Sequence, residues 1–334
     1  MEWELSRHMP LKITCATIAV LPFLAGSALA FEMGSPVMCD LGKTCFIQQY
    51  VDHDDSSGVR DTACGPRSYD GHQGTDFRLP DQASMMRGTN VLAVAGGKVR
   101  ATRDGLPDGV FNASGASPSN GRECGNGVLI DHEGGWSTQY CHLRKSSVVV
   151  RKGAAVRKGD VLGQIGQSGK AEFPHLHLTL RRGEKVVDPF DGTPMGTACQ
   201  AQGQTLWSAN SGIAYSPGGI MSAGFQTAVP EYTAIKARSP HGPRFSASVP
   251  ALVFWAHFFG VEQGDVLASQ LIDPGGKTIA EDRFKMAKNR ATQFRAVGRK
   301  RPGAAWPAGV YLGRAVLLRN GKPIAEMNAK TVVR

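Results

Sequence analysis

The chain has 334 residues, of which 38 are Lys or Arg and 28 are Asp or Glu, so its net charge at pH 7 is +10. This length is typical of two domains, each long enough to bury its own core. No coiled-coil heptad pattern, internal repeat or membrane-length apolar run follows residue 30, which excludes fibrous, solenoid and multi-span membrane proteins.

Residues 1–30 have the pattern of a signal peptide. Arg7 and Lys12 precede an apolar run from Ile13 to Leu29, and Ala28-Leu29-Ala30 is a small-x-small cleavage signal. The run is too short and too interrupted for a stable membrane span, although an uncleaved anchor is the alternative. We therefore expect an exported protein, periplasmic or secreted, with no membrane span once the signal peptide is removed.

Six cysteines remain after this leader: Cys39, Cys45, Cys64, Cys124, Cys141 and Cys199. An even number in an exported protein indicates disulfides. Cys39 and Cys45 flank a short turn and are predicted to pair. Two strands expected at 126–131 and 136–141 would bring Cys124 close to Cys141, which leaves Cys64 for Cys199. No Cys-x-x-Cys spacing supports a thiolate metal site.

Residues 31–70 are predicted to form a disulfide-containing segment that precedes the domain at 71–190. Cys45 to Val51 reads as a strand. The acidic cluster Asp52–Asp55, which includes His53, is interpreted as a solvated loop rather than as a cation site. A further hypothesis is that residues 39–69 cover the groove of the following domain as an inhibitory segment.

Three later fragments place His and Asp side chains in a pattern typical of a metal site. His72 and Asp76 are four residues apart, and His175 and His177 are two apart in a strand-like segment. Alternate residues of a strand point to the same side of a sheet. Two imidazoles and one carboxylate make a three-ligand zinc set with the fourth position left open, as in catalytic rather than structural sites. A further histidine, His142, lies between these fragments.

Together the fragments resemble the lysostaphin-type (LytM-like) zinc metallopeptidases, whose pattern is His-x-x-x-Asp, a His in a Tyr-x-His-Leu setting, and His-x-His. The resemblance runs from Gly71 to Pro189. It implies an all-β, duplicated-hybrid-motif domain over residues 71–190. It also implies that the substrate is the peptide stems of bacterial cell-wall peptidoglycan.

The same resemblance assigns roles to five side chains. It implies that one Zn²⁺ is held by His72, Asp76 and His177. It implies that His142 and His175 are catalytic histidines beside the metal. No His-Glu-x-x-His helix is present, so the thermolysin-type arrangement with a glutamate base is excluded.

The remainder of 71–190 consists of short β-branched runs separated by glycine turns, which predicts strands. Residues 105–125, rich in Gly, Pro, Ser and Asn, are predicted to form a long loop that borders the substrate groove. Gly159–Gly169 is interpreted as tight turns rather than a phosphate-binding loop, because no helix follows it. His132 is expected at the surface, at the end of a hairpin.

Residues 191–205 are predicted to be a linker, and residues 206–334 a smaller, basic β-sandwich of immunoglobulin-like type. Asn320-Gly321, between two strand-like segments, predicts a β-hairpin. His241 and His257 have no spacing that indicates a site.

All of the net positive charge lies in this C-terminal part. Residues 201–334 contain 17 Lys and Arg but only 7 Asp and Glu. We expect anionic envelope polymers or peptidoglycan carboxylates as its partners rather than nucleic acid, to which an exported domain has little access. The run Arg299-Lys300-Arg301 serves either such binding or, as a solvated loop, solubility.

The predicted function is a zinc endopeptidase that cuts the peptide cross-links of peptidoglycan with metal-activated water. His142 and His175 would supply the base and the proton donor, in an order left open. One alternative is an inactive, cell-wall-binding regulator of the same fold, although such a protein is expected to lose metal ligands and this sequence retains all three. The other is a secreted zinc peptidase or lysin that acts on proteins or on competitor cells.

Overall fold

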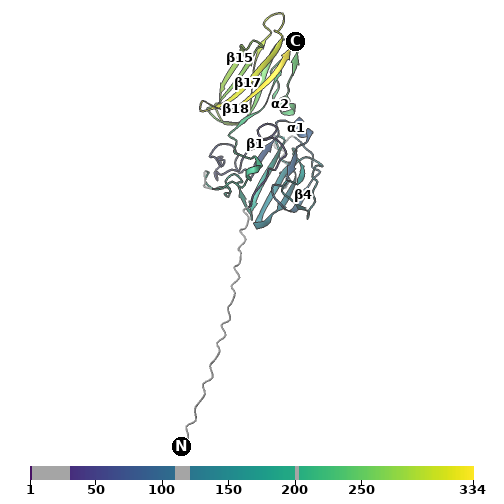
Figure 1. Ribbon diagram of the computed structural model, residues 1–334, viewed down its shortest axis with the longest axis vertical. Coiled ribbons are helices and arrows are strands. Elements are labelled where there is room, and N and C mark those ends of the chain that lie inside the picture. The colour runs from purple at the N-terminus through teal and green to yellow at the C-terminus, as the bar shows by residue number, and fades with distance from the viewer. Residues whose placement is uncertain (2–30, 110–120, 200–202) are drawn as a thin grey trace. The chain divides into compact units, whose positions relative to one another are not determined.

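The computed structural model describes residues 1, 31–109, 121–199 and 203–334 (Figure 1). The predicted signal peptide and the middle of the loop predicted at 105–125 lie outside the described residues. Residues Glu32–Arg334 form one compact unit. In the described part of the chain, no helix has the length and apolar character needed to traverse a bilayer.

Strands dominate the described residues, which confirms the all-β prediction. Two short helices accompany them, α1 (Gln82–Arg87) and α2 (Tyr232–Arg238). Asp81 precedes helix α1 as its N-cap, and its carboxylate accepts a hydrogen bond from the backbone N of Ser84 at 2.7 Å.

The larger sheet of the N-terminal half is antiparallel and has eight strands. Seven of them follow the order β1-β2-β9-β6-β5-β4-β7, and β10 pairs with β9. Their bounds are β1 (Phe46–Gln49), β2 (Thr75–Arg78), β4 (Gly97–Arg103), β5 (Asn126–Asp131), β6 (Trp136–Leu143), β7 (Ala155–Val156), β9 (His175–Arg182) and β10 (Lys185–Val187). A separate pair joins β3 (Asn90–Leu92) to β8 (Val161–Gln164).

Strand β9 lies between β2 and β6, and its two faces have different roles. Leu176, Leu178 and Leu180 are each at most 1% exposed and belong to the core. His175, His177, Thr179 and Arg181 alternate with them and therefore point to the opposite face. The register places His177 opposite Asp76 of β2 on one side and opposite Cys141 of β6 on the other.

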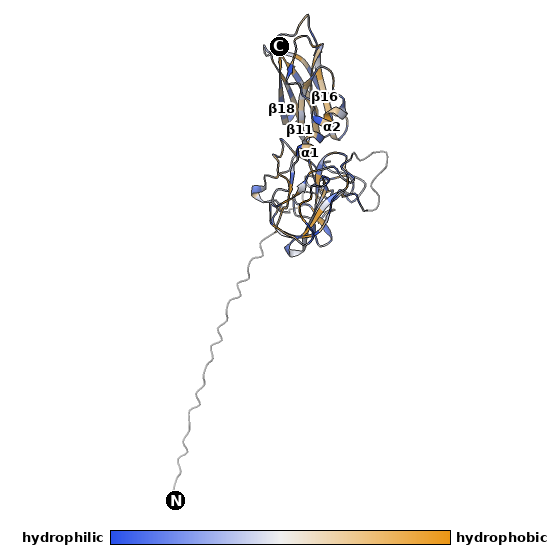
Figure 2. Ribbon diagram, turned by 90° about the vertical axis from the view of Figure 1, so that its right-hand side faces the viewer, coloured by the Kyte–Doolittle hydropathy of each residue, from blue (hydrophilic) through white to orange (hydrophobic). Residues whose placement is uncertain are grey.

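The C-terminal half contains two sheets that share one hydrophobic core. The first has the order β11-β13-β16, and the second has the order β12-β18-β17-β14-β15. Their bounds are β11 (Gly219–Gln226), β12 (Arg244–Phe245), β13 (Ala251–Val261), β14 (Val266–Ile272), β15 (Thr278–Lys285), β16 (Arg290–Lys300), β17 (Gly309–Arg319) and β18 (Lys322–Val333). Phe254 and Phe258 of β13 pack in the same buried cluster as Leu267 of β14 and Leu317 of β17. Figure 2 shows hydrophobic and hydrophilic residues interleaved along these strands.

The hairpin predicted at Asn320-Gly321 joins β17 to β18. Both residues have positive φ, 52° and 75° respectively, which is the backbone conformation that this dipeptide favours in two-residue hairpin turns. Of the basic run at 299–301, Arg299 and Lys300 are exposed at the end of β16 rather than in a loop.

The structure contains the three disulfides predicted from the sequence: Cys39–Cys45, Cys64–Cys199 and Cys124–Cys141. The predicted β5–β6 hairpin carries the last of them. Cys124 precedes β5 and Cys141 lies in β6, so the disulfide fixes the described end of the 105–125 loop to the central sheet.

Two sequence interpretations were wrong. The cluster at 52–55 is not a solvated loop throughout, because Asp52 is fully buried and His53 is 4% exposed. Asp52 accepts hydrogen bonds from the backbone N atoms of Asp54, Arg60 and Gly71 and so organises the chain around it. His132 is also buried rather than at the surface, since its ring bonds to Gly96 O and to Thr138 Oγ1, both at 2.7 Å.

Candidate metal centre

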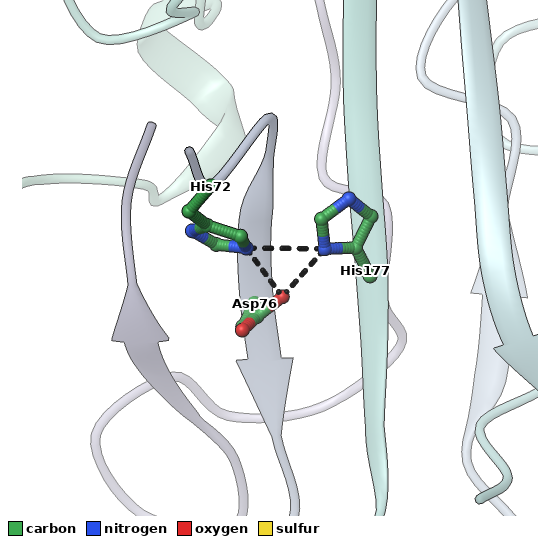
Figure 3. A group of neighbouring side chains, drawn as sticks. All are labelled: His72, Asp76 and His177. Carbon is green, nitrogen blue, oxygen red and sulfur yellow. Dashed lines mark hydrogen bonds and ion pairs between the residues drawn. The ribbon is translucent and has the colours of Figure 1, made fainter. Parts of the chain in front are cut away.

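Three side chains converge at the junction of β2 and β9 (Figure 3). His72 precedes β2, Asp76 lies in β2, and His177 lies in β9. His72 Nε2 is 3.2 Å from Asp76 Oδ1 and 3.1 Å from His177 Nδ1, and His177 Nδ1 is 2.9 Å from Asp76 Oδ1. The three atoms therefore form a nearly equilateral triangle.

The outer nitrogens of both imidazoles are already engaged. His72 Nδ1 lies 2.6 Å from the carbonyl oxygen of Tyr50 and must donate to it, because a carbonyl only accepts. His177 Nε2 lies 3.0 Å from Thr179 Oγ1. With a proton on each outer nitrogen, the inner nitrogens carry lone pairs directed at Asp76. Metal-binding histidines in proteins are held by this kind of outer hydrogen bond.

This donor set fits a divalent cation such as zinc. In the neutral form of His72, its Nε2 and the carboxylate of Asp76 are both acceptors, and the two groups are buried next to each other. Two buried acceptors that face each other are unfavourable unless a proton or a cation lies between them. Tetrahedral zinc with ligands at about 2.0–2.2 Å separates its ligand atoms by roughly 3.3–3.6 Å, close to the spacing found here.

Electrostatics at this centre favour the ionised carboxylate. Burial alone would favour neutral Asp76, but His72 and His175 hold the pKa of Asp76 well below its ordinary value. Burial disfavours a charged His72, but Asp76 raises the pKa of His72 above the ordinary value. Protonation of His72 at Nε2 therefore competes with metal binding.

Glycine is required at one position next to this centre. A Cβ atom on Gly74 would lie 2.6 Å from Leu178 O and 2.7 Å from His177 Nε2. The short Gly74 lets the chain that links His72 to Asp76 approach β9 closely enough for the three donor atoms to meet.

His142 and His175 lie beside the triangle. Their ring centroids are 4.6 Å apart, and His175 Nε2 is 3.7 Å from Asp76 Oδ1. His142 Nδ1 donates to Ser168 O and His175 Nδ1 donates to Phe173 O, both at 2.8 Å. Each therefore keeps Nε2 as an acceptor. Burial, together with His175 and His177, holds the pKa of His142 well below its ordinary value.

His142 has a left-handed backbone conformation, with φ of 63°. The register of β5 and β6 shifts between Asn126 and Val128, next to this residue. A non-glycine residue with positive φ costs free energy, and such residues cluster at functional sites. This local distortion of β6 accompanies the placement of the His142 ring against those of His175 and His177.

A second group of ligand-type residues, His53, Asp188 and Asp191, is also buried together. Its atoms are bonded within the protein. His53 bridges Thr197 O and Asp188 Oδ2, both at 3.0 Å, and Thr62 Oγ1 donates to Asp191 Oδ2 at 2.8 Å. This group fastens residues 53–62 to residues 188–197.

The sequence model described as Peptidase family M23 matches residues 70–189, the segment that carries all five histidine and aspartate positions. Over these residues the chain is similar to M23 peptidases. The resemblance described from the sequence is thus confirmed, with almost the same bounds.

Curated relatives include a peptidoglycan endopeptidase and a cell division protein. Peptidoglycan DD-endopeptidase ShyA of Vibrio cholerae is 34% identical over 128 residues, 38% of this chain and 24% of that protein. Cell division protein DipM of Caulobacter vibrioides is 34% identical over 114 residues, 34% of this chain and 17% of that protein. This chain therefore spans a quarter or less of the length of these two relatives.

Solved structures that match part of this chain include the catalytic domain of lysostaphin from Staphylococcus simulans. It is 21% identical, covers 42% of this chain and 86% of that chain, and has a TM-score of 0.28. A zinc-containing peptidase from Vibrio cholerae is 25% identical, covers 44% of this chain and 39% of that chain, and also has a TM-score of 0.28.

Several residues of the centre were not recognised from the sequence. Tyr50 contributes only a backbone oxygen, so no side-chain pattern could indicate it. Thr179 could have been found, because it lies two residues beyond His177 on the same face of a strand. Tyr69, whose ring centroid is 4.3 Å from that of His72, lies in a segment without regular pattern.

Proposed function

We propose that the protein is a zinc-dependent endopeptidase that hydrolyses the peptide cross-links of bacterial peptidoglycan. The observation that carries this proposal is the triangle of His72, Asp76 and His177 atoms beside two further imidazoles, inside an M23 domain. The names of the relatives, which include a peptidoglycan DD-endopeptidase, support the substrate class.

In this proposal His72, Asp76 and His177 hold one zinc ion. When bound, zinc lowers the pKa of a water molecule and polarises a carbonyl group. Three protein ligands would leave the fourth position of a tetrahedral zinc ion for water or substrate. The residues that line the pocket beside His177 include Tyr69, Gln73, His142 and Thr179.

His142 and His175 supply proton transfer. Each presents Nε2 as an acceptor, because its Nδ1 is held by a backbone carbonyl. Burial lowers the pKa of both rings, with His175 and His177 adding to the effect on His142. Both are therefore neutral at pH 7 and can take a proton at Nε2 and return it to the leaving amine.

The protein would act outside the cytoplasm, where peptidoglycan lies. Three disulfides agree with an oxidising compartment. The basic C-terminal half would keep the enzyme close to anionic envelope polymers or to the carboxylates of its substrate.

Digestion of purified peptidoglycan tests the proposal. The full chain loaded with zinc should release soluble muropeptides, and chelator should abolish the release. His177→Ala should be inactive while keeping its fold, whereas His241→Ala, remote from the ligand set in the sequence, should retain activity. Activity that survives in His177→Ala would refute the proposal. Cleavage of proteins but not of peptidoglycan would favour a secreted peptidase instead.

A further inference from the structure

The pocket above the metal centre continues along one face of β9. His177, Thr179 and Arg181 all line it, as does Gln139 of β6. Alternate residues in a strand share a face, and each residue advances the chain by about 3.3–3.4 Å. The backbone at Arg181 therefore lies about 13 Å along the strand from the backbone at His177.

Arg181 is a cation without an anionic partner among the described residues. Its Nη1 donates to Gln139 Oε1 at 3.0 Å. None of the ion pairs within the described ranges involves Arg181, although the side chain is half-buried. Burial lowers the pKa of its guanidinium, and no carboxylate opposes that effect. An unpaired, partly desolvated guanidinium in a pocket is suited to bind an anion.

The other basic residues of the pocket differ from Arg181. Arg103 is occupied, because it donates to Gly125 O at 2.6 Å and to Gly121 O at 3.1 Å. Lys170 is exposed at the rim. Arg182, the next residue of β9, points to the other face, where its guanidinium lies 5.2 Å from the ring centroid of Trp136. Arg181 lies on the same face of β9 as His177, is partly buried and is held by a hydrogen bond to Gln139 rather than by two backbone carbonyls.

We propose that Arg181, held in place by Gln139, binds a carboxylate of the substrate peptide and so selects acidic peptides. The proposal rests on the endopeptidase function proposed above. An extended peptide covers about 13 Å in four residues. The arginine side chain is flexible, so its guanidinium can lie closer to the metal centre than its backbone does. We therefore expect the recognised carboxylate on a residue two to four positions from the scissile bond. It is either a side-chain or a C-terminal carboxylate.

The test compares three versions of one cleavable peptide: with both carboxylates free, with only the side-chain carboxylate amidated, and with only the C-terminus amidated. The zinc-loaded full chain should cut the free acid with a kcat/KM about 10- to 100-fold above that of one amidated peptide. The amide that lowers the rate identifies the carboxylate.

Variants separate specificity from folding. Arg181→Gln should lose the preference, so that it cuts the acidic and the amidated peptides at similar rates. Arg181→Lys should recover part of the preference, and Arg182→Gln should keep all of it. Calorimetry on the chelator-treated full chain, which does not cleave, measures peptide affinity alone. The wild-type protein and the variants should show the same preferences in affinity as in cleavage.

The outcomes distinguish the two proposals. If the wild-type protein cuts the three peptides equally well, or if Arg181→Gln keeps the preference, Arg181 does not select the substrate and the endopeptidase proposal stands. If zinc-loaded protein cuts neither these peptides nor peptidoglycan, the endopeptidase proposal fails. In that case, the carboxylate site at Arg181 would still be supported if the chelator-treated wild-type protein binds the free acid more tightly than the amidated peptide in calorimetry and Arg181→Gln does not.

Discussion

Thr179 Oγ1 lies 3.0 Å from His177 Nε2, on the side of the imidazole that faces away from Asp76. Thr179 Oγ1 can accept the proton of His177 Nε2. In that tautomer Nδ1 offers its lone pair to a metal ion. Thr179 lies two residues after His177 in β9, so the same strand positions both side chains.

Thr179→Val should weaken zinc binding by about 10- to 100-fold, because removing the support of a ligating histidine has effects of this size. Competition with a chromophoric chelator measures the affinity directly. Thr138→Val is the matched control, since Thr138 is a buried threonine of the neighbouring strand whose hydroxyl lies 2.7 Å from His132 Nε2. Equal affinities in both variants would show that Thr179 does not orient His177.

Zinc should raise the thermal stability of the protein. A ligand that binds only the folded state stabilises it by about 4 kcal/mol when present at a thousand times its dissociation constant. Scanning calorimetry of the chelator-treated protein with and without added zinc should show this rise, and His177→Ala should show much less of it. A zinc effect that is undiminished in His177→Ala would place the binding site elsewhere.

Gly74→Ala should destabilise the fold and weaken metal binding together. The added methyl group would lie 2.6 Å from Leu178 O and 2.7 Å from His177 Nε2, so β9 and the turn must separate. Overpacking of this kind costs about 1–3 kcal/mol. Urea unfolding and zinc titration measure the two effects. Gly303→Ala, where nothing lies within 4 Å of the new methyl group, should change neither.

His257 makes stability depend on pH. Burial, helped by Arg78 and Lys236, lowers its pKa from 6.5 to about 3. Between these values the unfolded chain binds a proton that the folded chain does not. This contribution to stability is therefore complete above pH 6.5 and is lost as the pH falls toward 3.

The expected loss amounts to a few kcal/mol over that range. In urea unfolding, the free energy of unfolding of the wild-type protein should decrease as the pH is lowered. The decrease should be less steep for His257→Gln. Its Nε2 lies 3.2 Å from Tyr232 Oη, and glutamine can keep a bond to that hydroxyl. A pH slope identical in both proteins would mean that His257 does not titrate in this window.

The sequence predicted those parts of the structure that depend on local pattern. The alternation in 175–178 predicted a strand with both histidines on one face, and Asn320-Gly321 predicted its hairpin from backbone preference alone. The close approach of His72, Asp76 and His177 was expected only through the family resemblance, since 101 residues separate Asp76 from His177. Their role as metal ligands stays a prediction.

The errors concern residues whose partners are distant in the sequence. His53 looked like part of a polar loop, yet its partner Asp188 lies 135 residues later. His132 looked like a hairpin-end residue, yet its ring reaches Gly96, 36 residues earlier. Charged or polar residues become buried when groups distant in the sequence form hydrogen bonds with them. The local sequence does not show whether such partners exist.

The Cys64–Cys199 disulfide joins residues 135 positions apart. Those positions enclose the whole M23 segment at 70–189. A protease that nicks the backbone once anywhere between them leaves both fragments covalently attached. The disulfide also cannot form until Cys199, which follows the enclosed segment, has been synthesised. Its formation therefore indicates that the whole segment is present. Non-reducing electrophoresis of a nicked sample would therefore still show a single full-length band.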